Sequence, residues 1–245
     1  MLLTLKLAED VPEGRNAERV IQQRADYAQW FLREGVLGHC IYIDECGYNL
    51  WTRRSYGRAP RGQPARRVIH NQRGRNCNCT FAISNEVGLV HHSIRLGSTT
   101  LESFQKFIYE TCANAVQMFP VGDQIFLIYD NARPHINARV PDEFQNIAVN
   151  RTPPYSPFLN PVEMCHSAFK AGVKRSLSLP EMQQRVGDAT AAREAGLNLQ
   201  AWRAQLLEEV AQENVDVITP DKCARWYNHA QTYLARSIAR QPIDG

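Results

Sequence analysis

Apolar residues near the start of the chain recur first at a helical spacing and then at strand spacing. In residues 16–34 they share one stripe, which predicts a surface helix leading into the fold. Two short apolar runs follow, at 40–44 and 48–52, and they flank a break at Cys46 and Gly47. This arrangement predicts a β-hairpin.

The next hundred residues change from strand patterns to an alternation of helix and strand. Residues 76–97 predict two strands joined by a turn at Asn85, which would extend an antiparallel meander. Residues 101–119 have a clear helical period, and 124–130 and 146–152 read as buried strands with a short helix between them. A meander followed by helices and strands predicts an α/β fold, with a mixed central sheet flanked by helices.

The remainder of the chain is helical in composition but weaker in pattern. Beyond Lys174 the core periodicity fades, and Pro220 opens a last amphipathic helix. We therefore expect three parts: a helical arm or linker at 1–36, a catalytic domain at 37–218, and a C-terminal helix packed on that domain at 219–245.

Length and composition restrict the class of protein. The chain has 245 residues, of which 44% are hydrophobic, enough for one domain with a packed core. It has no apolar run long enough to cross a membrane, and its first residues lack the features of a secretory signal. The seven cysteines form no C-x-x-C pair, so we expect buried thiols in a reducing compartment rather than a structural zinc site.

Charge is more informative in its distribution than in its total. The net charge is only +3, but one acid-free stretch interrupted by glycine and proline is dense in arginine. Its first members are Arg53, Arg54, Arg58, Arg61, Arg66 and Arg67. Such a loop predicts contacts to DNA phosphates. The alternatives are a solvated turn and a nuclear-import signal.

Three carboxylates stand where catalytic acids could lie. Asp44 and Asp130 each end an apolar run, and Glu163 follows a proline-rich turn at the start of a helix. Acids at two strand ends and one helix start can hold a pair of Mg²⁺ ions, which clamp the attacking and leaving oxygens of a phosphodiester. Taken singly, each acid could instead cap a turn or helix, and Asn160, Pro161 and Glu163 fit a capping box.

The helix that Glu163 opens has two distinct faces. One face is apolar, and the other carries Glu163 with Lys170 and Lys174. If the acids hold metal, these lysines would lie where DNA phosphates approach the site.

Two motifs carry a family resemblance. YDNARPH at 129–135 and PPYSPFLNPVE at 153–163 closely resemble the signature of mariner-superfamily DDE transposases and their bacterial insertion-sequence relatives. The segment around Asp44, with Ile43, Glu45 and Trp51, resembles that family's first catalytic block, and the likeness covers roughly residues 22–236.

The resemblance implies a fold and a site. The fold would be RNase H-like, and the metal ligands would be Asp44, Asp130 and Glu163. Two Mg²⁺ ions would be bound, with Mn²⁺ as a substitute. Accessory roles would fall to Asn131, His135 and Asn160.

The implied activity is nicking at transposon ends, followed by attack of the freed 3′-hydroxyl on target DNA. The partners would be both DNAs and a second copy of the chain, in the nucleus of a eukaryote or with the bacterial nucleoid. Too few residues precede Asp44 for the paired helix-turn-helix modules usual in the family, so we expect a truncated, isolated or domesticated catalytic domain. The competing readings are a DNA-binding or interaction protein that has kept the fold without catalysis, and an RNase H-like nuclease on RNA–DNA hybrids.

Overall fold

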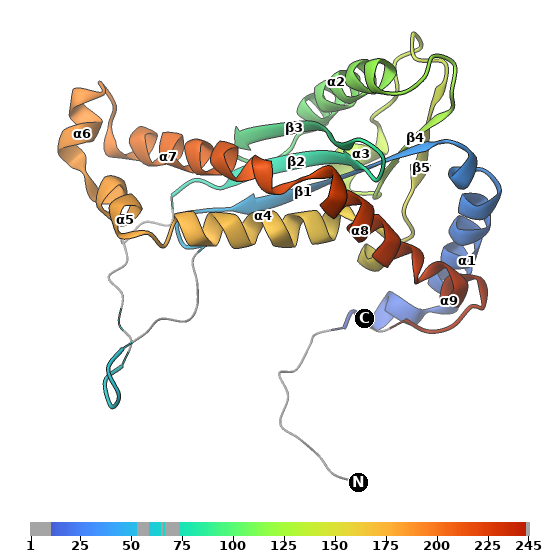
Figure 1. Ribbon diagram of the computed structural model, residues 1–245, viewed down its shortest axis with the longest axis horizontal. Coiled ribbons are helices and arrows are strands. Elements are labelled where there is room, and N and C mark those ends of the chain that lie inside the picture. Colours follow the sequence, from blue (N-terminus) through green and yellow to red (C-terminus); the bar gives the residue numbers. More distant parts are fainter. Residues whose placement is uncertain (1–10, 53–58, 65, 67–73, 244–245) are drawn as a thin grey trace.

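A five-stranded mixed sheet forms the centre of the computed structural model, which describes residues 11–52, 59–64, 66 and 74–243 (Figure 1). Its order is β3-β2-β1-β4-β5, with β2 antiparallel to β1 and β3, and β4 parallel to β1 and β5. The strands are β1 (His39–Tyr48), β2 (Cys77–Ser84), β3 (Gly88–Leu96), β4 (Ile125–Tyr129) and β5 (Ile147–Arg151). The expected mixed sheet is therefore confirmed.

Helices cover both faces of the sheet. The longer ones are α1 (Glu18–Arg33), α2 (Leu101–Met118), α4 (Val162–Ser176), α7 (Leu199–Asn214) and α8 (Pro220–Gln231). The shorter ones are α3 (Arg133–Ile136), α5 (Pro180–Gly187), α6 (Ala189–Glu194), α9 (Leu234–Ile238) and the 3₁₀ turns η1 (Glu13–Asn16), η2 (Gly35–Leu37), η3 (Pro157–Leu159) and η4 (Val215–Val217). In the described residues, no helix combines the length and apolar character needed to cross a bilayer.

The two faces of β1 belong to two separate hydrophobic clusters. Tyr42 and the other even-numbered apolar residues of the strand pack with α4, α7 and α8, whereas Ile43 packs with α2 on the opposite face. Successive side chains of a strand point to opposite faces. Asp44 therefore points toward the α4 side and Glu45 toward the α2 side. All seven cysteines are free and buried, which confirms the expectation of buried thiols.

The hairpin predicted for residues 40–52 is wrong. β1 runs without a break through Cys46 and Gly47, because β2 pairs with it along this whole length, ending at Tyr48 opposite Cys77. Gly47 interrupts the apolar pattern but keeps its place in the ladder opposite Asn78. The true partner is β2, which follows the arginine-rich segment.

The strand register brings the first two candidate acids to the same level. Tyr42 lies opposite Ile128 in the parallel pair of β1 and β4, and this is the last paired position of β1 with β4. Asp44 and Asp130 each lie two residues further on. Since the carboxyl ends of parallel strands meet at one edge, both acids emerge at the same place although β1 itself continues.

The predicted C-terminal helix is instead two helices. α8 ends at Gln231 and α9 begins at Leu234, after a turn in which the Thr232 hydroxyl donates a hydrogen bond to the carbonyl of His229. The turn directs α9 against α1, so both ends of the described chain meet (Figure 1). The N–H of Ile243 donates to Asn16 Oδ1 at 3.1 Å and closes this contact.

Candidate functional site

A cavity of about 350 Å³ lies between Asp44 in the middle of β1, the carboxyl end of β4 and the start of α4. Five of the six predicted catalytic and accessory residues line it: Asp44, Asp130, Glu163, Asn131 and Asn160. Residues 152–157 complete its wall. The sixth, His135, lies behind Asp130 and shapes the site from within the fold.

The surroundings of Asp44 disfavour the charged form of its carboxylate. Its Oδ1 accepts a hydrogen bond from the N–H of Glu45 at 2.8 Å, and the Asn160 amide reaches Oδ2 at 3.5 Å. Burial raises the pKa of Asp44 to about 7, and the charges of Glu163 and Asp130 also raise it, against the opposing effect of His166. Near neutral pH this group therefore exchanges readily between the acid and the carboxylate.

Asp130 is held in its charged form by His135. The imidazole Nδ1–H donates to Asp130 Oδ1 at 2.6 Å, and the Ala132 N–H donates to the same oxygen at 2.9 Å. Burial would raise the pKa of Asp130, but these hydrogen bonds and the nearby positive charges bring its pKa below the ordinary value. Asp130 and Asp44 are thus adjacent acids with pKa values shifted in opposite directions.

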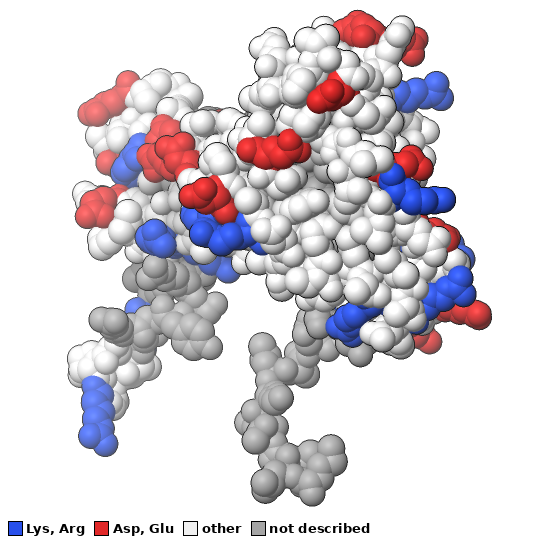
Figure 2. Space-filling view, turned by 45° about the vertical axis from the view of Figure 1, so that its right-hand side comes forward, with Lys and Arg blue, Asp and Glu red and all other residues white. Residues whose placement is uncertain are grey.

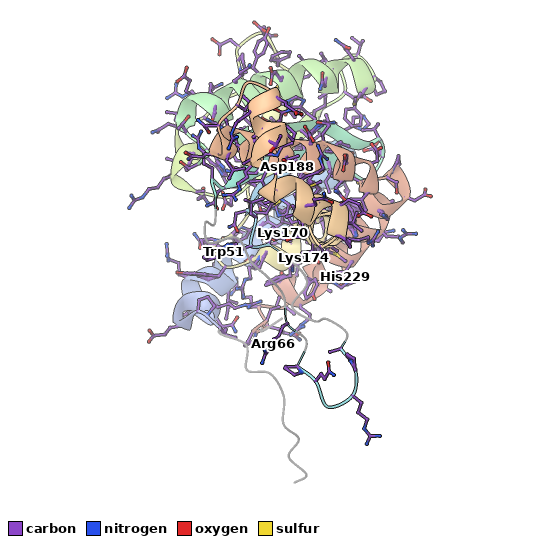
Figure 3. The ribbon with its side chains drawn as sticks, turned by 90° about the vertical axis from the view of Figure 1, so that its left-hand side faces the viewer. Trp51, Arg66, Lys170, Lys174, Asp188 and His229 are labelled. Carbon is purple, nitrogen blue, oxygen red and sulfur yellow. The ribbon has the colours of Figure 1, made fainter. Side chains whose placement is uncertain are left out.

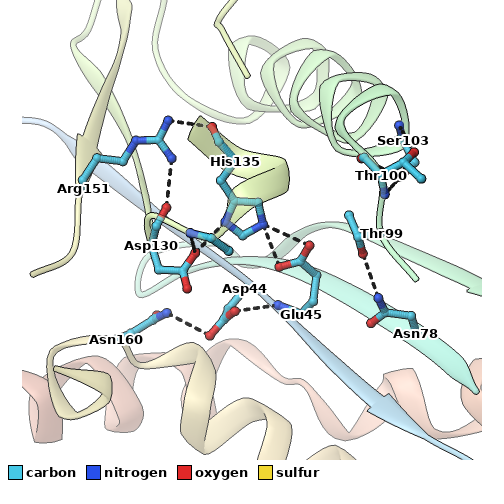
Figure 4. Close-up of polar contacts among 11 residues, drawn as sticks. Asp44, Glu45, Asn78, Thr99, Thr100, Ser103, Asp130, His135, Arg151 and Asn160 are labelled. Atoms are coloured by element: carbon cyan, nitrogen blue, oxygen red, sulfur yellow. Dashed lines mark hydrogen bonds and ion pairs between the residues drawn. The ribbon is translucent and has the colours of Figure 1, made fainter. Parts of the chain in front are cut away.

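His135 bridges Asp130, which follows β4, and Glu45 on the α2 face of β1. Its Nε2 lies 2.9 Å from Glu45 Oε2 (Figure 4), and its ring stacks on Phe104 with centroids 3.9 Å apart. Burial lowers the pKa of His135, yet hydrogen bonds to Asp130 and Glu45 outweigh it and raise the pKa to about 9. The ring is therefore an imidazolium between two carboxylates at neutral pH.

Arg151 is a site neighbour that the sequence pattern did not reveal. From the end of β5 it donates to the carbonyl of Asp130 at 2.9 Å and to that of His135 at 2.8 Å, while its guanidinium lies 4.0 Å from the Tyr129 ring centroid. These bonds fix the turn that carries Asp130. The two predicted strands could have indicated this position, because pairing of β5 with β4 places Arg151 opposite Tyr129, next to Asp130.

Glu163 approaches the cavity from the first turn of α4. The helix begins at Val162, whose N–H donates to Asn160 Oδ1 at 3.1 Å, so Asn160 assists the helix start as expected. The carboxylate of Glu163 does not complete a capping box but lies 3.7 Å from Nδ1 of His166. His166 was missed, although a histidine three residues after a glutamate on a helix shares its face.

One atom each from Asp44, Glu163 and His166 lie within 4.8 Å of one another, and this is the one such group of possible metal ligands in the described residues. Two of the three predicted metal ligands are thus brought together, and Asp130 lies beside them on the same cavity but outside this group.

The wall of the cavity is fixed by a residue far away in the sequence. Arg24 of α1 is buried, and it donates from Nε to Ser156 Oγ at 2.8 Å and from Nη2 to the Tyr155 carbonyl at 3.1 Å. The same guanidinium donates to Asn16 Oδ1 at 2.9 Å and to the carbonyl of Arg15. Tyr155 has a φ of 52°, a conformation that a non-glycine residue needs external support to keep.

The predicted DNA contacts lie in two places. Lys170 and Lys174 lie close together on α4, and Lys174 is exposed (Figure 3). In the arginine-rich segment, Arg61 and Arg66 are exposed. Four predicted contacts lie outside the described residues: Arg53, Arg54, Arg58 and Arg67. On the face shown in Figure 2, basic and acidic side chains are interspersed, in keeping with the small net charge.

Residues 39–184, more than half of the chain, match the family model described as DDE superfamily endonuclease. This range contains β1 to β5 and α4, and with them every residue of the cavity named above. Arg24 lies outside it. No curated protein matches the sequence.

Solved structures of one transposase share the fold. A pre-cleavage Mos1 transpososome aligns with a TM-score of 0.62 at 16% identity, over 99% of this chain and 67% of that one. The mariner Mos1 paired end complex with Mg gives 0.61 at 17% identity, over 97% and 67%. The Mos1 catalytic domain with Raltegravir and Mg gives 0.59 at 13% identity, over 96% and 98%.

This chain spans about two thirds of the transposase chains in those complexes and nearly all of the isolated catalytic domain. At such low identity the likeness establishes the fold alone, and it confirms the RNase H-like expectation.

Proposed function

The chain belongs to the DDE superfamily of endonucleases, and from this premise we propose that it cuts DNA at transposon ends and joins the freed 3′-hydroxyl to target DNA. The observation that carries the proposal is the meeting of Asp44, Asp130 and Glu163 at one cavity. The three acids come from separate segments of the chain, up to 119 positions apart. If each acid only capped a turn or a helix in its own segment, the three would have no need to meet.

The donor set fits divalent metal ions. Mg²⁺ prefers carboxylate oxygens and keeps several waters, and an open cavity of about 350 Å³ leaves room for them. Burial is the main cause of the raised pKa of Asp44, and the charges of Glu163 and Asp130 add to it, a repulsion that a bound cation would relieve. We propose that the three acids hold two Mg²⁺ ions, for which Mn²⁺ substitutes. The similar mariner Mos1 paired end complexes were solved with Mn and with Mg.

In the cutting reaction, water adds to the phosphorus and the bond to the 3′-oxygen breaks, leaving a 3′-hydroxyl and a 5′-phosphate. In the joining reaction, the 3′-hydroxyl attacks a phosphorus of the target DNA. The new P–O bond forms as the bond to the target's own 3′-oxygen breaks, and that oxygen leaves as a 3′-hydroxyl after taking up a proton. Bound metal ions would activate the attacking oxygen and stabilise the leaving one. The residues of the chain position these groups: His135 keeps Asp130 charged, Asn160 orients Asp44, and Lys170 and Lys174 contact flanking phosphates.

The partners follow from this reaction. We propose that the chain binds transposon-end and target DNA, and that two copies act together on paired ends. It would work wherever the DNA is, in a eukaryotic nucleus or beside a bacterial nucleoid. The similar Mos1 structures include a pre-cleavage transpososome and a paired-end complex with the left transposon end.

Nicking of supercoiled plasmid tests the proposed activity. We expect the wild type to convert supercoiled to open-circular DNA with Mg²⁺ or Mn²⁺ and not with EDTA. Asp130→Asn should bind DNA and leave it intact, since a neutral amide cannot replace a charged metal ligand. Asp142→Asn, an exposed aspartate away from the cavity, is the matched control and should nick like the wild type.

Equal nicking by Asp130→Asn and wild type would reject the triad. If the wild type nicks no plasmid with any metal ion tested, the alternative would be favoured: a DNA-binding protein of transposon origin that no longer catalyses.

The arginine-rich segment makes a separate prediction. Replacing both Arg61 and Arg66 with alanine should weaken DNA binding and reduce the slope of log affinity against log salt by about 1.8, because each lost phosphate contact removes roughly 0.9. Fluorescence anisotropy at several salt concentrations measures the slope. An unchanged slope would make this segment a solvated turn, whatever the result of the nicking assay.

A further inference from the structure

His166 is the polar side chain of the site for which the proposed mechanism gives no task. It lies on α4 one turn after Glu163, and only 5% of the residue is exposed. Phe81 of β2 borders its ring, with centroids 6.1 Å apart. A histidine packed so deeply between a helix and the sheet ordinarily forms hydrogen bonds with both nitrogens or bears a ligand.

The ring has no hydrogen bond within the described part of the chain. Its Nε2 is buried without a partner, and its Nδ1 lies 3.7 Å from Glu163 Oε2, beyond hydrogen-bond length. A buried polar group left in this state destabilises the fold, because it has given up its hydrogen bonds to water. Nδ1 is thus the nitrogen that lies nearest the Glu163 carboxylate, and Nε2 is the buried nitrogen that lacks a partner.

The spacing of the nearby oxygens suits a metal ion as that partner. One atom each from Asp44, Glu163 and His166 lie within 4.8 Å of one another. Around an octahedral ion with bonds of about 2.1 Å, neighbouring ligands lie about 3 Å apart and opposite ones about 4.2 Å. Small side-chain rotations would bring the three atoms to these distances.

We propose that His166 is a nitrogen ligand of the divalent ion held between Asp44 and Glu163, and that this makes the site selective for Mn²⁺ over Mg²⁺. The proposal rests on the proposed function, because it concerns one of the metal ions of that site. Imidazole suits transition metals such as Mn²⁺, whereas Mg²⁺ favours oxygen ligands alone and is reluctant to exchange its waters.

Pulsed electron paramagnetic resonance of tag-free protein loaded with Mn²⁺ tests the ligand directly. Nitrogen-14 modulation of the Mn²⁺ signal is expected for the wild type, and protein grown with nitrogen-15 histidine should replace it with the nitrogen-15 pattern. His166→Phe, which fits beside Phe81, should lose the modulation. His92→Phe on β3 is the matched control and should keep it. The labelled wild type gives a result that does not depend on the folding of any variant.

Calorimetry gives the second readout. The ratio of the Mg²⁺ to the Mn²⁺ dissociation constant should fall at least about tenfold in His166→Phe, because the variant loses its Mn²⁺ affinity more than its Mg²⁺ affinity. Absence of nitrogen modulation in the wild type, or an unchanged ratio, would overturn the ligand assignment.

The two proposals fail in different ways. Nitrogen modulation without nicking in any metal would keep His166 as a ligand and reject the proposed function. Nicking without modulation would keep the function and leave His166 a packing residue.

Discussion

Asp44→Asn is expected to reduce plasmid nicking by about 1,000-fold and, at the same time, to stabilise the metal-free protein at pH 8. The loss of activity follows from the removal of a shared metal ligand, since metal ions contribute several kcal/mol to transition-state stabilisation and about 4 kcal/mol corresponds to that factor. The gain in stability follows from the burial of the carboxylate, which the fold tolerates poorly when charged.

The sign of the stability effect depends on pH. The pKa of Asp44 is raised from 3.8 to about 7 in the folded protein, so folding is disfavoured by its charge above pH 7 and unaffected by it below about pH 4. The asparagine variant should therefore have a higher free energy of unfolding at pH 8, by at most about 4 kcal/mol, and the difference should vanish toward pH 4.

Urea denaturation in EDTA at both pH values measures this difference. Mg²⁺ should then stabilise the wild type and leave the variant unchanged, because ligands raise the stability of the state that binds them. Asp142→Asn should match the wild type throughout. A variant less stable than wild type at pH 8 would contradict the strained-carboxylate account, even if nicking is lost.

Arg24→Met is expected to lower the free energy of unfolding by about 3 kcal/mol or more, and to lower the melting temperature by about 6–12 °C. Methionine fills much of the same volume, but it leaves Ser156 Oγ, Asn16 Oδ1 and two carbonyls without their buried donor. Nicking by the folded variant should fall too, because Tyr155 and the rest of the cavity wall lose their support.

Thermal melts of Arg24→Met and of Arg19→Met provide the comparison. Arg19 lies on the same helix and is exposed, so its replacement should change the melting temperature little. If Arg24→Met melts with the wild type, the hydrogen bonds of this guanidinium do not stabilise the cavity wall, and the support of Tyr155 must come from elsewhere.

Much of the fold and site was predictable from local patterns. The helix at α2 and the strands β2 to β5 follow periodicity closely. Asp130 follows the end of β4 and Glu163 lies in the first turn of α4, as predicted, whereas Asp44 lies within β1, which continues to Tyr48. The hairpin prediction failed because it treated Gly47 as a break, whereas the pairing of β1 with a strand almost thirty residues later decides that position. Strand partners are chosen by tertiary contacts that a window of sequence does not contain.

The supporting residues of the site were harder to find for a related reason. Arg24 and Arg151 contact the site only through the sheet order and the packing of α1, and each looks like an ordinary charged residue in its own segment. Glu45 was noticed beside Asp44, but its contact with His135 depends on the sheet order as well. His166 was different. Its spacing from Glu163 was readable on the helix, but an apolar stripe of buried neighbours favoured a packing role.

Asp44 and Glu45 are consecutive in the chain, yet they serve opposite layers of the protein: one faces the cavity beside α4, and the other pairs with His135 beneath α2. Because strand side chains alternate, the loss or gain of one residue in β1 would exchange these two acids between the layers. The number of residues in this part of β1 is therefore constrained together with the identity of the two acids.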